Sequence, residues 1–231
     1  MPRSGFVAIV GRPSSGKSTL LNTICGYKVS IVSPTPQTTR NKIRGIITDD
    51  RGQIVFLDTP GFHTSQRTFN LHMRGLVTDS LEEVEAVLYI LDATREPGEE
   101  EGQLAELLRS VRVPVVCAVN KIDHDRARPG ETRRFLESRL ENPQVLEVSA
   151  VTGTGTAELV EALFSHLEEG EFYYPEEFYT DQDPALRIAE IVREKAISDL
   201  REEIPHALFV EIADMEMRDV PGPNRGATAT G

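Results

Sequence analysis

The chain has 231 residues, of which 39% are hydrophobic and 27% are charged, and its formal net charge is −12. This composition is typical of a soluble globular protein with one large domain, or with a medium domain and a smaller unit. The acidic balance argues against a protein that coats nucleic acid over its whole surface. No apolar run approaches the roughly 18 residues of a membrane span, and no signal-peptide pattern opens the chain. We therefore expect a cytoplasmic protein in which Cys25 and Cys117 are buried rather than paired.

Short apolar runs alternate with amphipathic helical segments up to about residue 167. The alternation predicts an α/β domain whose mostly parallel sheet is flanked by helices. Apolar residues spaced by three or four predict helices over 104–111 and 159–167. A more polar run over 44–48 suits a sheet edge. Buried strands are expected where the runs have no polar face, over 6–10, 54–57, 86–91, 113–119 and 145–148.

The composition changes after residue 168. Residues 169–184 are acidic, aromatic and proline-bearing without any period, which predicts a linker. A helical apolar face over 185–201 and a strand over 207–212 follow, and together they cannot bury a core. We predict a first domain over 1–168, the linker over 169–184, an incomplete α/β unit over 185–219 and a disordered tail over 220–231.

Residues 11–18, Gly-Arg-Pro-Ser-Ser-Gly-Lys-Ser, match the Walker A pattern between an expected strand and an expected helix. Glycines let backbone N–H groups turn around phosphate oxygens, and the helix N-terminus favours negative charge. We expect Lys17 to reach the β and γ phosphates and the Ser18 hydroxyl to bind magnesium. The expected phosphate-binding residues are Gly11, Arg12, Pro13, Ser14, Ser15, Gly16, Lys17, Ser18 and Thr19.

Asp58, Thr59, Pro60 and Gly61 follow an expected strand. The Asp58 carboxylate is expected to hold a magnesium-bound water, and the Gly61 N–H to meet the γ-phosphate. Phe62 stands where a water-positioning glutamine could follow, and it cannot orient water. His63 comes next and could serve, but a solvated histidine is the simpler interpretation. Hydrolysis should therefore be slow unless a partner or an ion completes the site.

Two further motifs predict that the base is guanine. Asn120, Lys121 and Asp123 belong to an Asn-Lys-x-Asp motif, and its last carboxylate can accept hydrogen bonds from guanine N1–H and the 2-amino group. Adenine has no such donor pair and would leave that charge unpaired. A backbone N–H from Ser149, Ala150 or Val151 could meet guanine O6. Each motif follows an expected strand, at the sheet edge where α/β proteins bind ligands.

Thr38 and Thr39 lie in a polar stretch without a core-forming pattern. One of these hydroxyls, by preference that of Thr39, could join magnesium only while a γ-phosphate is present. The loop would then order with GTP and be released with GDP. An ordinary polar surface loop is the alternative. The expected magnesium ligands are Ser18, Thr38, Thr39 and Asp58, and the expected catalytic residues are Lys17, Thr39 and Gly61.

Several segments are similar to one family of proteins. They are Pro-Gln-Thr-Thr-Arg at 36–40, the residues at 58–63, Asn70 with Met73, the residues at 174–176 with 180–181, and 188–205. Over residues 5–218 the chain resembles the Era family of bacterial ribosome-associated GTPases, within the TrmE–Era group. The resemblance implies a GTPase domain followed by a type II KH domain that recognises the 3′ end of small-subunit ribosomal RNA during ribosome assembly. A monomer is expected, with peripheral membrane contact at most.

The chain departs from that family at two points. Ser14 stands where the group often has an asparagine that, in some members, helps to bind an activating potassium ion, so potassium dependence stays open. A KH domain clamps RNA with a Gly-x-x-Gly loop, and none follows Ile212. The glycines Gly222 and Gly226 have the wrong spacing. We therefore expect impaired RNA binding in this chain.

Other functions also fit parts of the sequence. Phe62 is compatible with a GTP-dependent binding module with negligible turnover, and the motif set also suits another TrmE–Era-type translation GTPase. A small-molecule kinase is disfavoured, because residues 120–123 serve base selection that such an enzyme does not need there.

Overall fold

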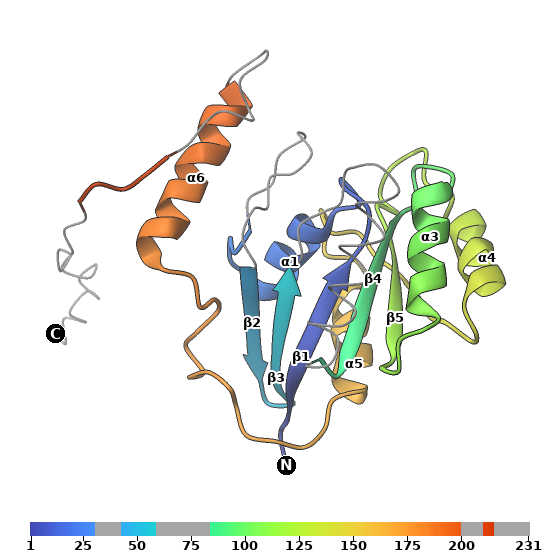
Figure 1. Ribbon diagram of the computed structural model, residues 1–231, viewed down its shortest axis with the longest axis horizontal. Coiled ribbons are helices and arrows are strands. Elements are labelled where there is room, and N and C mark those ends of the chain that lie inside the picture. Colours follow the sequence, from blue (N-terminus) through green and yellow to red (C-terminus); the bar gives the residue numbers. More distant parts are fainter. Residues whose placement is uncertain (31–42, 59–83, 200–209, 215–231) are drawn as a thin grey trace, which may run out of the picture.

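The computed structural model describes residues 1–30, 43–58, 84–199 and 210–214. Its centre is a six-stranded sheet in the order β2-β3-β1-β4-β5-β6 (Figure 1). β2 pairs with β3 in antiparallel fashion, and all other neighbours pair in parallel. The predicted α/β fold with a mostly parallel sheet is therefore confirmed. The strands are β1 (Arg3–Val10), β2 (Ile43–Asp49), β3 (Gly52–Asp58), β4 (Ala86–Asp92), β5 (Val115–Asn120) and β6 (Gln144–Glu147).

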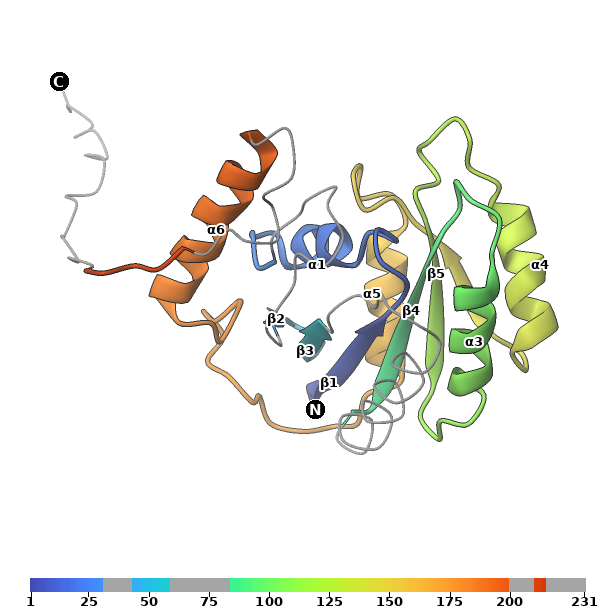
Figure 2. The same cartoon turned by 45° about the horizontal axis from the view of Figure 1, so that its top comes forward.

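Helices cover both faces of the sheet. α1 (Lys17–Cys25) and α5 (Thr156–Ser165) pack on one face, and α3 (Glu99–Leu108) and α4 (Pro129–Arg139) pack on the other (Figures 1 and 2). Because both faces are covered, every residue of β4 is buried, as expected of a strand without a polar side. α4 was not among the predicted helices, because its sequence is mostly charged and Leu136 is its one fully buried apolar side chain.

The two cysteines lie on opposite faces of the sheet. Cys25 belongs to the core under α1 and α5, and Cys117 to the core under α3 and α4. Both are free and buried, and burial raises the pKa of each thiol to about 12. The prediction of unpaired, buried cysteines is confirmed, and neither thiol is reactive near neutral pH.

The segment predicted as a linker contacts β2 and β3 along part of its length. Gln53 is buried in β3, and its side-chain oxygen accepts hydrogen bonds from the N–H groups of Tyr173 and Tyr174 at 2.9 and 3.0 Å. Its amide nitrogen donates to the Tyr174 carbonyl at 2.9 Å. Farther along, the Ile46 N–H donates to the carbonyl of Tyr179 at 2.9 Å. The connection is therefore anchored to the domain at two places, the interior strand β3 through Gln53 and the edge strand β2 through Ile46.

α6 (Pro184–Asp199) extends away from the sheet (Figure 1). Arg187 donates to the Lys28 carbonyl at 3.2 Å, and Lys28 pairs with Glu194 at 2.5 Å. Apolar side chains at Leu186, Ile188 and Val192 remain 40–47% exposed. Within the described residues, no helix is long and apolar enough to cross a membrane.

The strand predicted over 207–212 is not seen in its described part. Residues 210–212 have no regular secondary structure. A strand requires a neighbour to take up its backbone hydrogen bonds, and the described residues place none beside them. Residues 207–209 and the tail predicted over 220–231 lie outside the described residues.

Candidate nucleotide-binding site

The predicted motifs meet at the carboxyl edge of the sheet. The P-loop (residues 11–18) follows β1, residues 120–123 begin at the end of β5, and residues 149–151 follow β6. The buried Asn120 side chain joins all three segments. Its amide nitrogen donates to the Ser15 carbonyl, and its oxygen accepts the Ala150 N–H, each at 2.9 Å. This carboxyl edge is where open α/β sheets bind ligands.

Glycines bring the P-loop close to its neighbours. A Cβ at Gly11 would lie 2.5 Å from the Ile90 carbonyl oxygen, and a Cβ at Gly16 would lie 2.2 Å from the amide nitrogen of Asn120. Gly16 also has a left-handed φ of 98° and precedes α1 without a side-chain cap. The first N–H groups of α1 therefore face the loop, an arrangement that suits an anion.

The Lys17 side chain is held inside the P-loop. The side chain is buried, and Nζ donates to the carbonyl oxygens of Gly11 and Arg12 at 2.9 Å each. The Ser15 hydroxyl is buried without a hydrogen-bond partner among the described residues. A buried polar group in this condition is costly. The uncapped helix, the lysine and the orphaned hydroxyl together fit a phosphate group.

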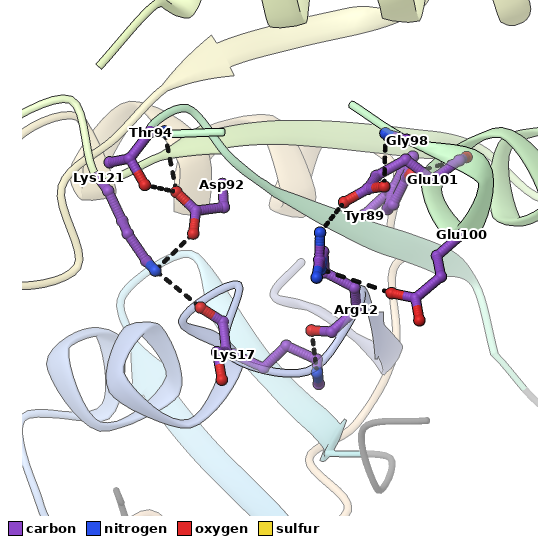
Figure 3. A network of polar contacts seen from close by, with 10 residues as sticks. Arg12, Lys17, Tyr89, Asp92, Thr94, Gly98, Glu100, Glu101 and Lys121 are labelled. Carbon is purple, nitrogen blue, oxygen red and sulfur yellow. Dashed lines mark hydrogen bonds and ion pairs between the residues drawn. The ribbon is translucent and has the colours of Figure 1, made fainter. Parts of the chain in front are cut away.

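Lys121 connects the P-loop to β4. Its Nζ donates to the Ser14 carbonyl at 2.7 Å and to Asp92 Oδ2 at 2.6 Å (Figure 3). Ser14 and Lys121 both have left-handed backbones, with φ of 61° and 67°. Such conformations are uncommon for these residue types and persist where the surroundings hold them. The Lys121 bridge holds the Ser14 peptide in place.

Asp92 was missed in the sequence, although it ends an apolar strand at the ligand edge. Burial by itself would raise the pKa of Asp92, but hydrogen bonds from Lys121 and Thr94 outweigh it and lower the pKa below its usual value. Thr94 donates through its hydroxyl at 2.7 Å and its N–H at 2.9 Å. The carboxylate therefore stays ionised and keeps the Lys121 ammonium in one place.

The expected base-recognition residues lie together. Ser149 is buried, and its hydroxyl donates to Asp123 Oδ1 at 2.6 Å. The same hydroxyl accepts the Thr152 N–H at 3.1 Å. One oxygen of the Asp123 carboxylate is thus oriented by the loop after β6. Val151 is 76% exposed, and because a valine side chain has no hydrogen-bonding group, its polar contribution to the site is limited to its backbone.

The magnesium side of the predicted site is described in part. Ser18 and Thr19 lie in the first turn of α1. Asp58 ends β3, but its side chain lies outside the described part, as do Thr38, Thr39 and the residues at 59–63. Within the described residues, no cluster of three or more His, Cys, Asp or Glu could hold a metal. Magnesium does not need such a cluster, because it is commonly held by one or two protein ligands, phosphate oxygens and water.

The chain is similar to a family of ribosome-binding GTPases and to GTPase Era from several bacteria. The family model described as 50S ribosome-binding GTPase matches residues 6–121. GTPase Era from Borrelia garinii subsp. bavariensis is 49% identical over 215 residues, which cover 93% of this chain and 74% of that protein. The chain belongs to the Era family of GTPases. GTPase Era from Treponema denticola is also 49% identical, over 217 residues that cover 93% and 74% of the two chains.

Solved Era structures share the fold. A crystal structure of Era in complex with MgGDPNP and nucleotides 1506–1542 of 16S ribosomal RNA matches 89% of this chain and 70% of that chain, with a TM-score of 0.76 and 35% identity. An Aquifex aeolicus Era variant bound to GDP·AlF4− matches 88% and 70% of the two chains, with the same TM-score and 36% identity. The expected family is confirmed, and the protein is a GTPase.

Proposed function

We propose that this Era-family GTPase is a GTP-dependent switch in the assembly of the small ribosomal subunit. The observation that carries the nucleotide part is the Asn120 bridge, which holds the P-loop and the two base-recognition segments as one site. The ribosomal part is supported by the similarity to an Era structure that contains a 16S ribosomal RNA fragment. Because ribosomes are assembled in the cytoplasm, we expect the protein to act there.

The base is recognised by Asp123 and one backbone N–H. The Asp123 carboxylate accepts the N1–H and 2-amino hydrogens of guanine. The N–H groups of Ser149 and Ala150 already donate to the Thr154 carbonyl and to Asn120, each at 2.9 Å. We therefore assign the Val151 N–H as the donor to guanine O6.

Phosphate binding exchanges the hydrogen-bond partners of Lys17. Lys17 leaves the carbonyls of Gly11 and Arg12 for the β and γ phosphates, and the N–H groups at the start of α1 meet phosphate oxygens. The residues that would hold Mg2+ are Ser18 and Asp58, with Thr38 or Thr39. When bound, the ion neutralises negative charge on the phosphates. Thr39 and Gly61 remain our candidates for sensing the γ-phosphate.

Hydrolysis lacks a glutamine for the attacking water, because Phe62 follows Gly61. We propose that an ion or the ribosomal partner completes the site, with potassium as the first ion to test. The test is to measure the single-turnover rate of GTP hydrolysis in potassium or in sodium, each with and without small ribosomal subunits. Stimulation well above the basal rate is expected. A rate unchanged in every arm would favour a GTP-dependent binding module, the candidate that Phe62 also allows.

The nucleotide preference is the first test of the proposal. Titration with fluorescent GTP and ATP analogues should give at least about 100-fold tighter binding of GTP, because adenine offers the Asp123 carboxylate no pair of N–H donors. Equal affinities would overturn the assignment of a guanine site.

For the remainder of the chain we propose a GTPase domain over residues 1–168, the connection over 169–184 and the first part of a KH-like unit over 185–219. No Gly-x-x-Gly sequence follows Ile212, so we expect the 231-residue chain to bind RNA weakly. A filter-binding titration with the 3′ end of 16S ribosomal RNA tests this, and tight, salt-resistant binding would contradict it.

A further inference from the structure

Arg12, the second residue of the P-loop, turns its side chain away from the phosphate cradle. Its guanidinium lies against the start of α3, where Nη1 is 3.1 Å from Glu101 Oε1 and Nε is 3.6 Å from Glu100 Oε2 (Figure 3). The Arg12 side chain is 17% exposed and that of Glu101 is 7% exposed. A P-loop binds phosphate mainly through its backbone and its lysine, so phosphate binding does not require this ion pair.

Glu101 is itself firmly anchored. Its second carboxylate oxygen, Oε2, accepts the Gly98 N–H at 2.9 Å, as a glutamate in the first turn of a helix can. Its carbonyl accepts the Tyr89 hydroxyl at 3.2 Å. Burial raises the pKa of Tyr89 well above its usual value, so the phenol stays a donor. Tyr89 pairs in the sheet with Val10, the residue before the P-loop.

Arg12 connects the ion pair with Glu101 to the side chain of Lys17. Arg12 contacts Glu101 with its side chain, and its carbonyl accepts the Lys17 ammonium at 2.9 Å. The backbone at Arg12 therefore helps to set the place of that ammonium. A buried ion pair fixes geometry strongly, because the removal of one partner leaves the other charge uncompensated.

We propose that Glu101 is a positioning residue of the GTPase site, which acts through Arg12 on the first turn of the P-loop and so on Lys17. The inference rests on the proposed GTP hydrolysis and extends it to α3, a helix outside the recognised motifs. Glu101 touches no phosphate; its effect is on the place of Lys17, which matters most when charge develops on the transferred phosphoryl group.

Glu100 provides a matched control. It is the neighbouring residue, carries the same charge, is 47% exposed and lies 3.6 Å from the guanidinium. Because Glu100 is half-exposed and its contact with Arg12 is longer, this pair should contribute less than the pair with Glu101. Glu101→Gln should therefore lower the single-turnover rate of GTP hydrolysis about tenfold, with GDP affinity changed less than about threefold, whereas Glu100→Gln should stay within about twofold of the parent protein.

A double-mutant cycle separates positioning from simple support of α3. Arg12→Gln removes the same contact from the P-loop side and should produce a similar loss of rate. The double variant Arg12→Gln/Glu101→Gln should be no slower than the slower single variant, because both changes break one interaction. Melting temperatures measured with GDP identify any variant that fails to fold, and in that case the other single variant carries the test.

Two results would overturn the inference: equal rates for Glu101→Gln and Glu100→Gln, or additive losses in the cycle. Failure of the proposed function looks different. In that case the parent protein itself would neither prefer GTP nor hydrolyse it.

Discussion

The base half and the phosphate half of the site are held in different ways. In the base half, Asn120, Lys121 and Asp123 each make hydrogen bonds to other parts of the protein. In the phosphate half, Lys17 binds carbonyls of its own loop, and the Ser15 hydroxyl has no partner among the described residues. The base half is therefore a template built by the fold, whereas the phosphate half has groups that are ready to change partner.

The difference has a physical reason. The Asn120 side chain satisfies the Ser15 carbonyl and the Ala150 N–H at once, so giving up either bond would leave a buried group unpaired. Lys17 can exchange carbonyl oxygens for phosphate oxygens without such a loss, because an anion is a stronger partner for an ammonium. Base selection should thus depend on a fixed shape, and phosphate binding on a rearrangement.

The largest expected effect belongs to the phosphate half. Lys17→Ala should slow GTP hydrolysis about 1000-fold, because the variant loses a charge that stabilises the transition state. The preference for GTP over ATP should stay unchanged, since the base half is intact. Single-turnover kinetics and nucleotide titrations measure the two quantities, with Lys28→Ala as the control lysine. A change in base preference would show that the two halves are not separable.

Asp123→Asn tests the base half. GTP affinity should fall about 100-fold, because an amide cannot accept both guanine donors as the carboxylate does. The preference over ATP should fall with it. Competition between the two nucleotides on the same protein measures the ratio, and an unaltered ratio would remove Asp123 from base recognition.

Asn120→Ala tests the template before any nucleotide binds. The variant leaves the Ser15 carbonyl and the Ala150 N–H without their partner, which should lower the free energy of unfolding by about 2–3 kcal/mol. Urea unfolding of the nucleotide-free protein measures this loss. A stability equal to that of the parent would mean that the bridge forms only with nucleotide.

Ser15→Ala makes the same stability test in the phosphate half, and we expect it to change the free energy of unfolding least. The buried hydroxyl has no partner among the described residues, so its removal should change the free energy of unfolding by less than about 0.5 kcal/mol, or raise it slightly. The same urea experiment applies. A loss as large as that of Asn120→Ala would contradict the contrast between the two halves.

Much of the fold and site followed from local patterns in the sequence. The apolar runs predicted the sheet because a buried parallel strand needs apolar side chains on both faces, and β2 appeared at the edge suggested by its polar residues. Residues 11–18, 120–123 and 149–151 were recognised because a short segment carries each motif. By itself, then, the sequence determined the class of fold, and it predicted the segments that we propose bind the phosphates and the base.

Other features depend on residues that are far apart in the chain. In the sequence, Gln53 is an isolated polar residue beside an apolar run. In the structure, its side chain accepts hydrogen bonds from the backbone of Tyr173 and Tyr174, 120 and 121 positions further along the chain. Asp92 and Glu101 belong to no nucleotide motif, and each becomes meaningful only when the sheet brings it beside Lys121 or Arg12. A polar side chain has no defined partner until the backbone places one within about 3 Å. Only the tertiary structure could decide which carboxylates hold the P-loop.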